Sequence, residues 1–161
     1  MIYNKVETDL IKLGNAKKFN PSEEKWITPV YYNGEPLEFT LKNKYVKIEG
    51  IEENIYNKDY ITIKSKEFSD IIETIVKKLG TTNPLTTDGS FRAVINSKTK
   101  SSEEISKLRQ ANFNACISLS IPTIYSDENK KTVQIYAKDI VVTKILDDNL
   151  EIDFDKLQLA M

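Results

Sequence analysis

The sequence predicts a β-rich domain of the α+β class. Three observations support this prediction. Short runs of alternating apolar and polar residues recur along most of the chain, residues 67–79 carry one continuous helical apolar stripe, and two long β-like runs at 113–125 and 131–146 close the body of the chain. Alternation with a period of two is typical of half-buried strands, and a stripe with a period of 3.6 is typical of a helix that covers a sheet.

The first twenty residues carry an ambiguous signal. Val6, Leu10 and Leu13 have the spacing of a short helix, and Gly14 would end it. We therefore expect a short helix here, followed by a break at residues 20–22.

Residues 26–49 predict a group of strands. The run 26–32 is rich in aromatic and β-branched residues, and the Asn33-Gly34 pair that follows is the strongest short signal for a β-hairpin. Alternation in 37–42, in 45–48 and again in 60–64 predicts further short strands.

The clearest helix spans residues 67–79. Ser65 can cap its start, and Gly80 stops it. The apolar stripe consists of Phe68, Ile71, Ile72, Ile75, Val76 and Leu79.

After a polar loop at 81–90, the run 91–96 predicts another strand, and the two long runs at 113–125 and 131–146 predict a hairpin. About seven short strands need their edges hidden, and a small barrel does this economically. We therefore predict an OB-fold-like five-stranded barrel with extra strands and one strong amphipathic helix.

The length of 161 residues fits a single domain, which we place at residues 1–146. This part carries 22 basic and 19 acidic side chains, whereas residues 147–161 carry one basic and five acidic side chains. The chain therefore combines a mildly basic body with an acidic-hydrophobic C-terminal tail.

The composition excludes several classes of chemistry. The chain has no His and one Cys, which excludes Ser-His and Cys-His nucleophiles, the usual zinc sites and an intramolecular disulfide. Phosphate-binding glycine fingerprints are missing, and the carboxylate pairs are adjacent residues in polar stretches. We therefore expect a protein that is not an enzyme and needs neither metal nor cofactor.

The expected location is intracellular. No apolar stretch reaches the ~18 residues of a membrane span, and no signal peptide is recognisable. We expect the cytoplasm of a host or a viral replication compartment, with no membrane partner.

The alternation also sorts side chains onto faces. Three strands place a Tyr on the polar face with a Lys two or four residues further on, and the strand 91–96 adds Arg92. The three pairs are Tyr45 with Lys47, Tyr60 with Lys64, and Tyr136 with Lys138. Aromatic rings stack on unpaired bases, and interleaved cations neutralise phosphates, so this pattern favours single-stranded nucleic acid. An ordinary half-exposed strand surface also carries Tyr and Lys, which is the plainer interpretation.

The predicted DNA-binding residues combine these strands with nearby aromatic and basic side chains. They are Tyr31, Tyr32, Lys42, Lys44, Tyr45, Lys47, Tyr60, Lys64, Arg92, Lys98, Lys100, Lys130, Lys131, Tyr136 and Lys138. In the tail, an acidic-hydrophobic group could bind replication proteins, or it could simply dock and end the domain. That group is Asp147, Asp148, Asp153, Phe154 and Asp155.

Three blocks of the chain resemble a known family. They are VYYNGEPLEFTLKNKYVKIEGI (30–51), FRAVINSKTK (91–100) and NFNACISLSIPTIYSDENKKTVQIYAKDIVVTKIL (112–146). Their order is similar to that of the single-stranded DNA-binding proteins of large nucleocytoplasmic DNA viruses, of the African swine fever virus and poxvirus types. Phage single-stranded DNA-binding proteins with an OB-fold also end in an acidic aromatic tail. The resemblance implies a barrel that coats single-stranded DNA during replication, recombination and repair.

The sequence therefore predicts a protein that coats single-stranded DNA with little sequence preference. It leaves the oligomeric state open, a homo-oligomer included. The alternative is a protein-interaction module, such as a virion, inhibitor or replisome-assembly subunit, that uses the same sheet without binding nucleic acid.

Overall fold

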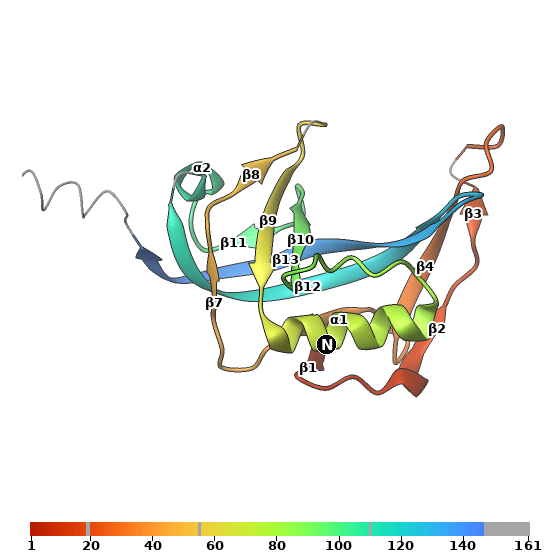
Figure 1. Cartoon of the computed structure of the whole chain (residues 1–161), viewed down its shortest axis with the longest axis horizontal. Helices are drawn as coiled ribbons and strands as arrows, with labels where there is room; N and C mark the ends of the chain where they lie inside the picture. Colours follow the sequence, from red (N-terminus) through yellow and green to blue (C-terminus); the bar gives the residue numbers. More distant parts are fainter. Residues whose placement is uncertain (19, 55, 110, 147–161) are drawn as a thin grey trace, which may run out of the picture.

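The computed structural model describes residues 1–18, 20–54, 56–109 and 111–146, which form one large curved sheet and one long helix (Figure 1). The strands are β1 (Ile2–Tyr3), β2 (Ile11–Leu13), β3 (Lys17–Lys18), β4 (Trp26–Tyr32), β5 (Glu35–Pro36), β6 (Glu38–Thr40), β7 (Val46–Ile48), β8 (Glu52–Glu53), β9 (Asp59–Lys64), β10 (Ser90–Ile95), β11 (Lys100–Ser101), β12 (Asn112–Ser126) and β13 (Lys131–Leu146). The helices are the 3-10 turn η1 (Thr8–Leu10), α1 (Lys66–Leu79) and α2 (Ile105–Leu108).

A long antiparallel hairpin, β12 with β13, forms the centre of the sheet, as the two closing runs predict. Its ladder begins with Asn112 opposite Leu146 and ends with Ser126 opposite Lys131. The sheet order is β1-β6-β12-β13-β10-β9-β8, in which β13 and β10 run parallel. Because β12 is 15 residues long, it pairs in turn with β7, β6 and β4.

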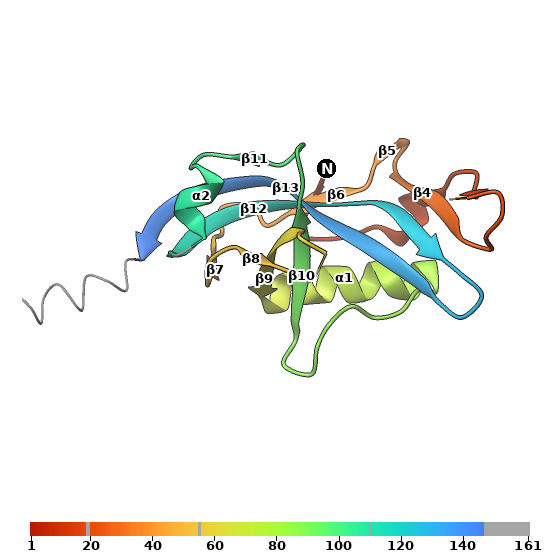
Figure 2. The ribbon, with the colours of Figure 1, turned by 90° about the horizontal axis from the view of Figure 1, so that it is seen from above.

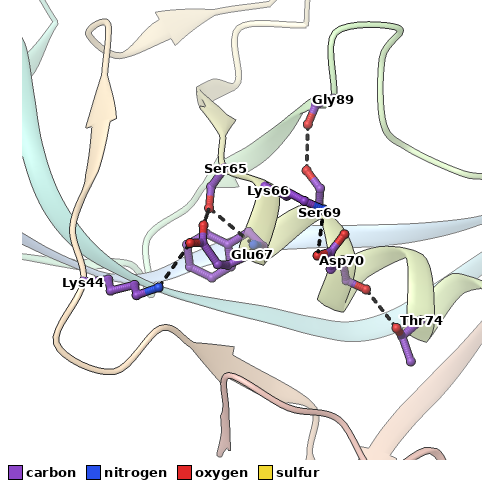
Figure 3. Close-up of polar contacts among 9 residues, drawn as sticks. Lys44, Ser65, Lys66, Glu67, Ser69, Asp70, Thr74 and Gly89 are labelled. Atoms are coloured by element: carbon purple, nitrogen blue, oxygen red, sulfur yellow. Dashed lines mark hydrogen bonds and ion pairs between the residues drawn. The ribbon is translucent and has the colours of Figure 1, made fainter.

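Helix α1 confirms the predicted apolar stripe and both of its ends. The Ser65 hydroxyl accepts the backbone N–H of Phe68 at 3.3 Å, and Gly80 adopts the left-handed conformation with φ 68°. Figure 3 shows the polar contacts at the start of the helix, where Glu67 forms an ion pair with Lys44 (3.1 Å). The Ser69 hydroxyl donates to the Gly89 carbonyl at 2.8 Å, which ties α1 to the loop before β10.

The hydrophobic core lies between α1 and one face of the sheet (Figure 2). The Phe68 ring meets Phe39 of β6 and Phe91 of β10 edge-to-face, with centroids 6.0 and 6.3 Å apart. Ile61 and Ile63 of β9 are fully buried, as their alternation predicts. The opposite face of the sheet carries the remaining residues of each alternating strand, and we call it the outer face.

The β-rich α+β class is confirmed, whereas the predicted OB-fold-like five-stranded barrel is replaced by an open mixed sheet. The sheet is open: its strand order begins at β1 and ends at β8, and within the described residues no ladder joins these two ends. The physical reason is that α1 buries the apolar face, so the sheet need not curl onto itself to form a core. The end strand β8 consists of two exposed glutamates, which discourage edge-to-edge pairing.

The N-terminal region forms a strand where the sequence suggests a helix. Only the 3-10 turn η1 is helical, and Ile11–Leu13 form β2, which pairs with β4. Gly14 donates its N–H to the Pro29 carbonyl (2.9 Å) instead of ending a helix. The predicted hairpin turn is confirmed, because Tyr32 of β4 pairs with Glu35 of β5 around Asn33 and Gly34, both with positive φ.

The single tryptophan lies on β4, where it is half-buried. Trp26 pairs with Ser126 of β12 and with Lys18 of β3. The Lys18 ammonium lies 5.4 Å from the centre of the indole ring. This region is at the far end of β12 from its partner β7.

Candidate nucleic-acid interface

The register of the sheet places a row of side chains across the outer face. Tyr136 of β13 is opposite Val94 of β10, which is opposite Tyr60 of β9. On the other side, Tyr136 is opposite Ser120 of β12, which is opposite Glu38 of β6. Because paired residues point to the same side of a sheet, these five side chains share the outer face, away from α1.

Three adjoining hollows meet at Tyr136, which is half-buried. The first, of about 650 Å³, also contains Lys58 and Arg109. The second, of about 500 Å³, contains Lys98 and Lys138, and the third, of about 260 Å³, contains Lys58 and Arg92. We call these hollows together the Tyr136 groove; its cationic side chains are Lys58, Arg92, Lys98, Arg109 and Lys138.

Two of the five cations are paired with carboxylates of the groove. The Arg109 guanidinium makes two hydrogen bonds of 2.8 Å to the Asp59 carboxylate, and these bonds raise the pKa of Arg109. The Lys138 ammonium lies 2.7 Å from Glu38, whose hydrogen bond raises the pKa of Lys138. Both cations therefore stay charged at neutral pH.

The other three cations of the groove are Lys58, Arg92 and Lys98. None of them forms an ion pair with another residue in the part of the chain that the structure describes. Five cations against the two carboxylates Asp59 and Glu38 leave a surplus of three positive charges. The groove is therefore locally basic in a chain whose net charge is −1.

The structure does not fit the predicted role of Tyr60 as a ring that stacks on a base. Its side chain points to the outer face as expected, but the residue is only 7% exposed. The Arg92 guanidinium covers the ring at 4.5 Å, and a hydrogen bond with Glu52 is the main cause that raises the pKa of the Tyr60 phenol. No base can reach a covered ring, so Tyr60 supports Arg92 instead.

Lys47 and Lys64 lie in a separate hollow of about 520 Å³ between β7 and β9. Three carboxylates share this hollow with them, so its charge does not favour a polyanion. They are Glu49, Glu52 and Asp88. Hydrogen bonds from the Thr86 hydroxyl and from Ser90 lower the pKa of Asp88 to about 2, so it remains ionised.

The remaining predicted residues within the described chain do not line the Tyr136 groove. Tyr31 packs beside Gly14, and the Tyr32 hydroxyl accepts the Glu7 N–H at 3.1 Å. The others are Lys42, Lys44 and Tyr45 before β7, Lys100 in β11, and Lys130 and Lys131 at the β12–β13 turn, all of them exposed. The tail residues Asp147, Asp148, Asp153, Phe154 and Asp155 lie outside the described residues.

Lys58 and Arg109 are not among the DNA-binding residues predicted from the sequence. Lys58 directly precedes β9, and Arg109 follows α2, so neither belongs to an alternating strand. A signal for Lys58 exists in the sequence, because it stands two residues before Tyr60 and two after Tyr56. Arg109 enters the groove only because Asp59 holds it there, which the sequence does not show.

Among the described residues, no group of three or more His, Cys, Asp or Glu side chains could hold a metal ion. No helix among them is long and apolar enough to cross a membrane.

The sequence of the chain matches a known protein family. A family of unknown function, DUF5482, matches residues 1–161. The chain is similar to the uncharacterized killer plasmid pGKl-2 protein 5 of Kluyveromyces lactis, with 52% identity over 161 residues that cover both chains completely. No solved structure matches the chain. The match over the whole sequence shows that the chain belongs to the family of unknown function DUF5482.

Proposed function

We propose that this protein binds and coats single-stranded DNA with little sequence preference, and that the Tyr136 groove is its binding surface. The observation that carries the proposal is one half-buried tyrosine at the junction of three hollows that contain five cations. Tyr136 would stack against a base, and the cations would neutralise the phosphates on either side.

Physical chemistry favours a single strand over a duplex at such a surface. A ring that lines a groove can stack only on a base whose face is free, and in a duplex the base faces are covered by their neighbours. Stacking contributes about 1–3 kcal/mol per base whatever the base, and cations bind any phosphate, so little sequence preference is expected.

The similarity to a plasmid protein is consistent with a role at DNA. That protein is encoded on a killer plasmid, and copying a DNA element exposes single strands. The resemblance of three sequence blocks to viral single-stranded DNA-binding proteins points the same way. The proposed role is a non-catalytic one in replication, recombination or repair of a plasmid or viral DNA, inside the host cell.

Fluorescence anisotropy with a labelled oligo-dT of ~30 nucleotides tests the proposal, in a salt series and beside a duplex of equal length. We expect tight binding of the single strand that weakens with salt, and poor binding of the duplex. Absence of binding at low salt would contradict the proposal and would favour the alternative, a module that binds a protein partner.

The first variant is Tyr136→Ala. Loss of one stacked base should weaken binding by about 1–3 kcal/mol, which is roughly 5- to 150-fold in Kd. Tyr45→Ala is the matched control, because Tyr45 is 62% exposed and lines none of the three hollows. If Tyr45→Ala lost affinity and Tyr136→Ala did not, the DNA path would lie over β7 instead.

A further inference from the structure

Two exposed tyrosines lie at opposite ends of the strand order, one on the first strand and one in the turn that joins the last two. Tyr3 of β1 is 56% exposed, and Tyr56, in the turn between β8 and β9, is 74% exposed. Neither belongs to the hydrophobic core. Both rings are therefore free to meet a ligand, and bases of a single strand stack on exposed aromatic rings of this kind.

Tyr3 continues the Tyr136 groove at its β6 side. It is opposite Thr40 in the parallel β1–β6 ladder, so its side chain lies on the same face as Thr40 and Glu38. Glu38 forms the ion pair with Lys138. Tyr3 itself is close enough to Lys138 to be among the groups that raise the pKa of this lysine, after Glu38 and Asp139.

Tyr56 continues the groove at its β9 side. Asn57 and Lys58, which follow it, line the largest of the three hollows. The Asn54 side chain organises the turn, because its oxygen accepts the backbone N–H of Tyr56 at 2.9 Å and that of Lys58 at 3.1 Å. Asn54 also donates its own N–H to the Lys58 carbonyl at 3.0 Å. Tyr56 therefore directly precedes two residues of the groove lining, and Asn54 holds its backbone N–H.

We propose that Tyr3 and Tyr56 are two further stacking positions, and that a bound strand crosses the sheet from β1 over Tyr136 to the β8–β9 turn. This inference rests on the proposed function and adds the path and the length of the ligand. It adds two aromatic rings to Tyr136, whereas Tyr60 cannot serve because Arg92 covers it.

The sheet order gives the length of this path. Six strand-to-strand steps separate β1 from β8, and at ~4.8 Å each they span about 29 Å. With the ~3.4 Å rise of a stacked strand, this distance corresponds to about eight or nine nucleotides, and a more extended strand needs fewer. The value lies within the ~4–16 nucleotides bound by single OB folds.

A length series of oligo-dT, from ~4 to ~16 nucleotides, tests the path through competition with the labelled ~30-mer. Wild-type affinity should rise up to about eight or nine nucleotides and then level off. In the double variant Tyr3→Ala/Tyr56→Ala it should level off at a shorter length, and each single variant should lose roughly 5- to 150-fold on the ~16-mer.

The matched controls separate the rings from other effects. Tyr3→Phe and Tyr56→Phe keep the ring and should bind as wild type, and Tyr45→Ala should change neither the affinity nor the length at which it levels off. Suppose that the wild type binds and that Tyr136→Ala weakens binding. Unchanged affinity of both Tyr3→Ala and Tyr56→Ala would then overturn this path and leave the proposed function intact. A wild type that does not bind would overturn both.

Discussion

The Tyr60 ring beneath the Arg92 guanidinium shows how one buried aromatic side chain can prepare a surface cation. The guanidinium lies 4.5 Å from the ring centre, and Tyr60 is only 7% exposed, so its ring is fixed between neighbouring strands. An arginine fixed in this way loses less side-chain freedom when it meets a phosphate than a mobile one. The pair therefore places Arg92 ready for binding on the outer face.

Replacing the ring tests this positioning role. Tyr60→Phe keeps the ring and should bind single-stranded DNA as wild type, whereas Tyr60→Leu loses the cation–π contact, about 0.5–1 kcal/mol, and should raise Kd roughly 2- to 5-fold. Anisotropy titration measures both. Equal affinities of the Phe and Leu variants would show that the ring does not hold Arg92 for the ligand.

The burial of Tyr60 could not be predicted from the sequence. Alternation in 60–64 gives the face to which a side chain points, and Tyr60 does point to the outer face. Whether a side chain on that face is exposed or covered depends on which side chains of the neighbouring strands lie next to it. Glu52 and Arg92 come from β8 and β10, and their meeting over Tyr60 is a long-range property of the register.

Helix α1 is the element in which sequence and structure agree best. Its stripe, its cap at Ser65 and its stop at Gly80 all act within a few residues, so a local pattern is sufficient to predict them. The hairpin at Asn33-Gly34 and the β12–β13 hairpin are local in the same sense. Residues 8–13 differ, because β2 exists only through pairing with β4, nearly twenty residues away.

The cap of α1 gives a prediction for stability. Ser65→Ala removes the acceptor for the Phe68 N–H and should lower the free energy of unfolding by about 1 kcal/mol. Urea denaturation measures the change as a lower midpoint at constant slope. Ser106→Ala, at an exposed serine of α2, is the control and should leave the midpoint unchanged. Because α1 lies behind the outer face, a Ser65→Ala protein with weakened DNA binding would contradict the separation of the two faces.

The whole molecule divides its two tasks between the two faces of one sheet. One face and α1 form the core, and the outer face carries the Tyr136 groove. Tyr136, Arg92, Lys98 and Lys138 of the groove could be predicted, because each follows from alternation or from its place beside a strand. Lys58 offers only the local signal of its spacing from Tyr56 and Tyr60. Arg109 could not be predicted, because it joins the groove only through its ion pair with Asp59 of β9. The open sheet also escaped prediction, because it too depends on contacts between distant parts of the chain.

The charge of the groove predicts its salt dependence. If only the three unpaired cations release counterions, the slope of log K against log salt should be about −2, and if phosphates also displace Asp59 and Glu38 it should approach about −3.5. Lys58→Ala should make the slope less steep by about 0.7. Lys47→Ala, in the hollow shared with three carboxylates, should leave it unchanged. A steeper loss for Lys47→Ala than for Lys58→Ala would move the phosphate path to β7.

The place of Trp26 has a practical consequence. The chain has one indole, half-buried beside Lys18 on β4, and it lines none of the hollows of the Tyr136 groove. Its emission therefore reports whether the sheet is intact, with no direct quenching by a base on the outer face. A ligand that binds in the groove stabilises the native state. It therefore changes the Trp26 signal only by raising the denaturant midpoint of unfolding, and the midpoint increases with ligand concentration. The protein carries its own separate optical reporter of unfolding, free from interference by the binding event.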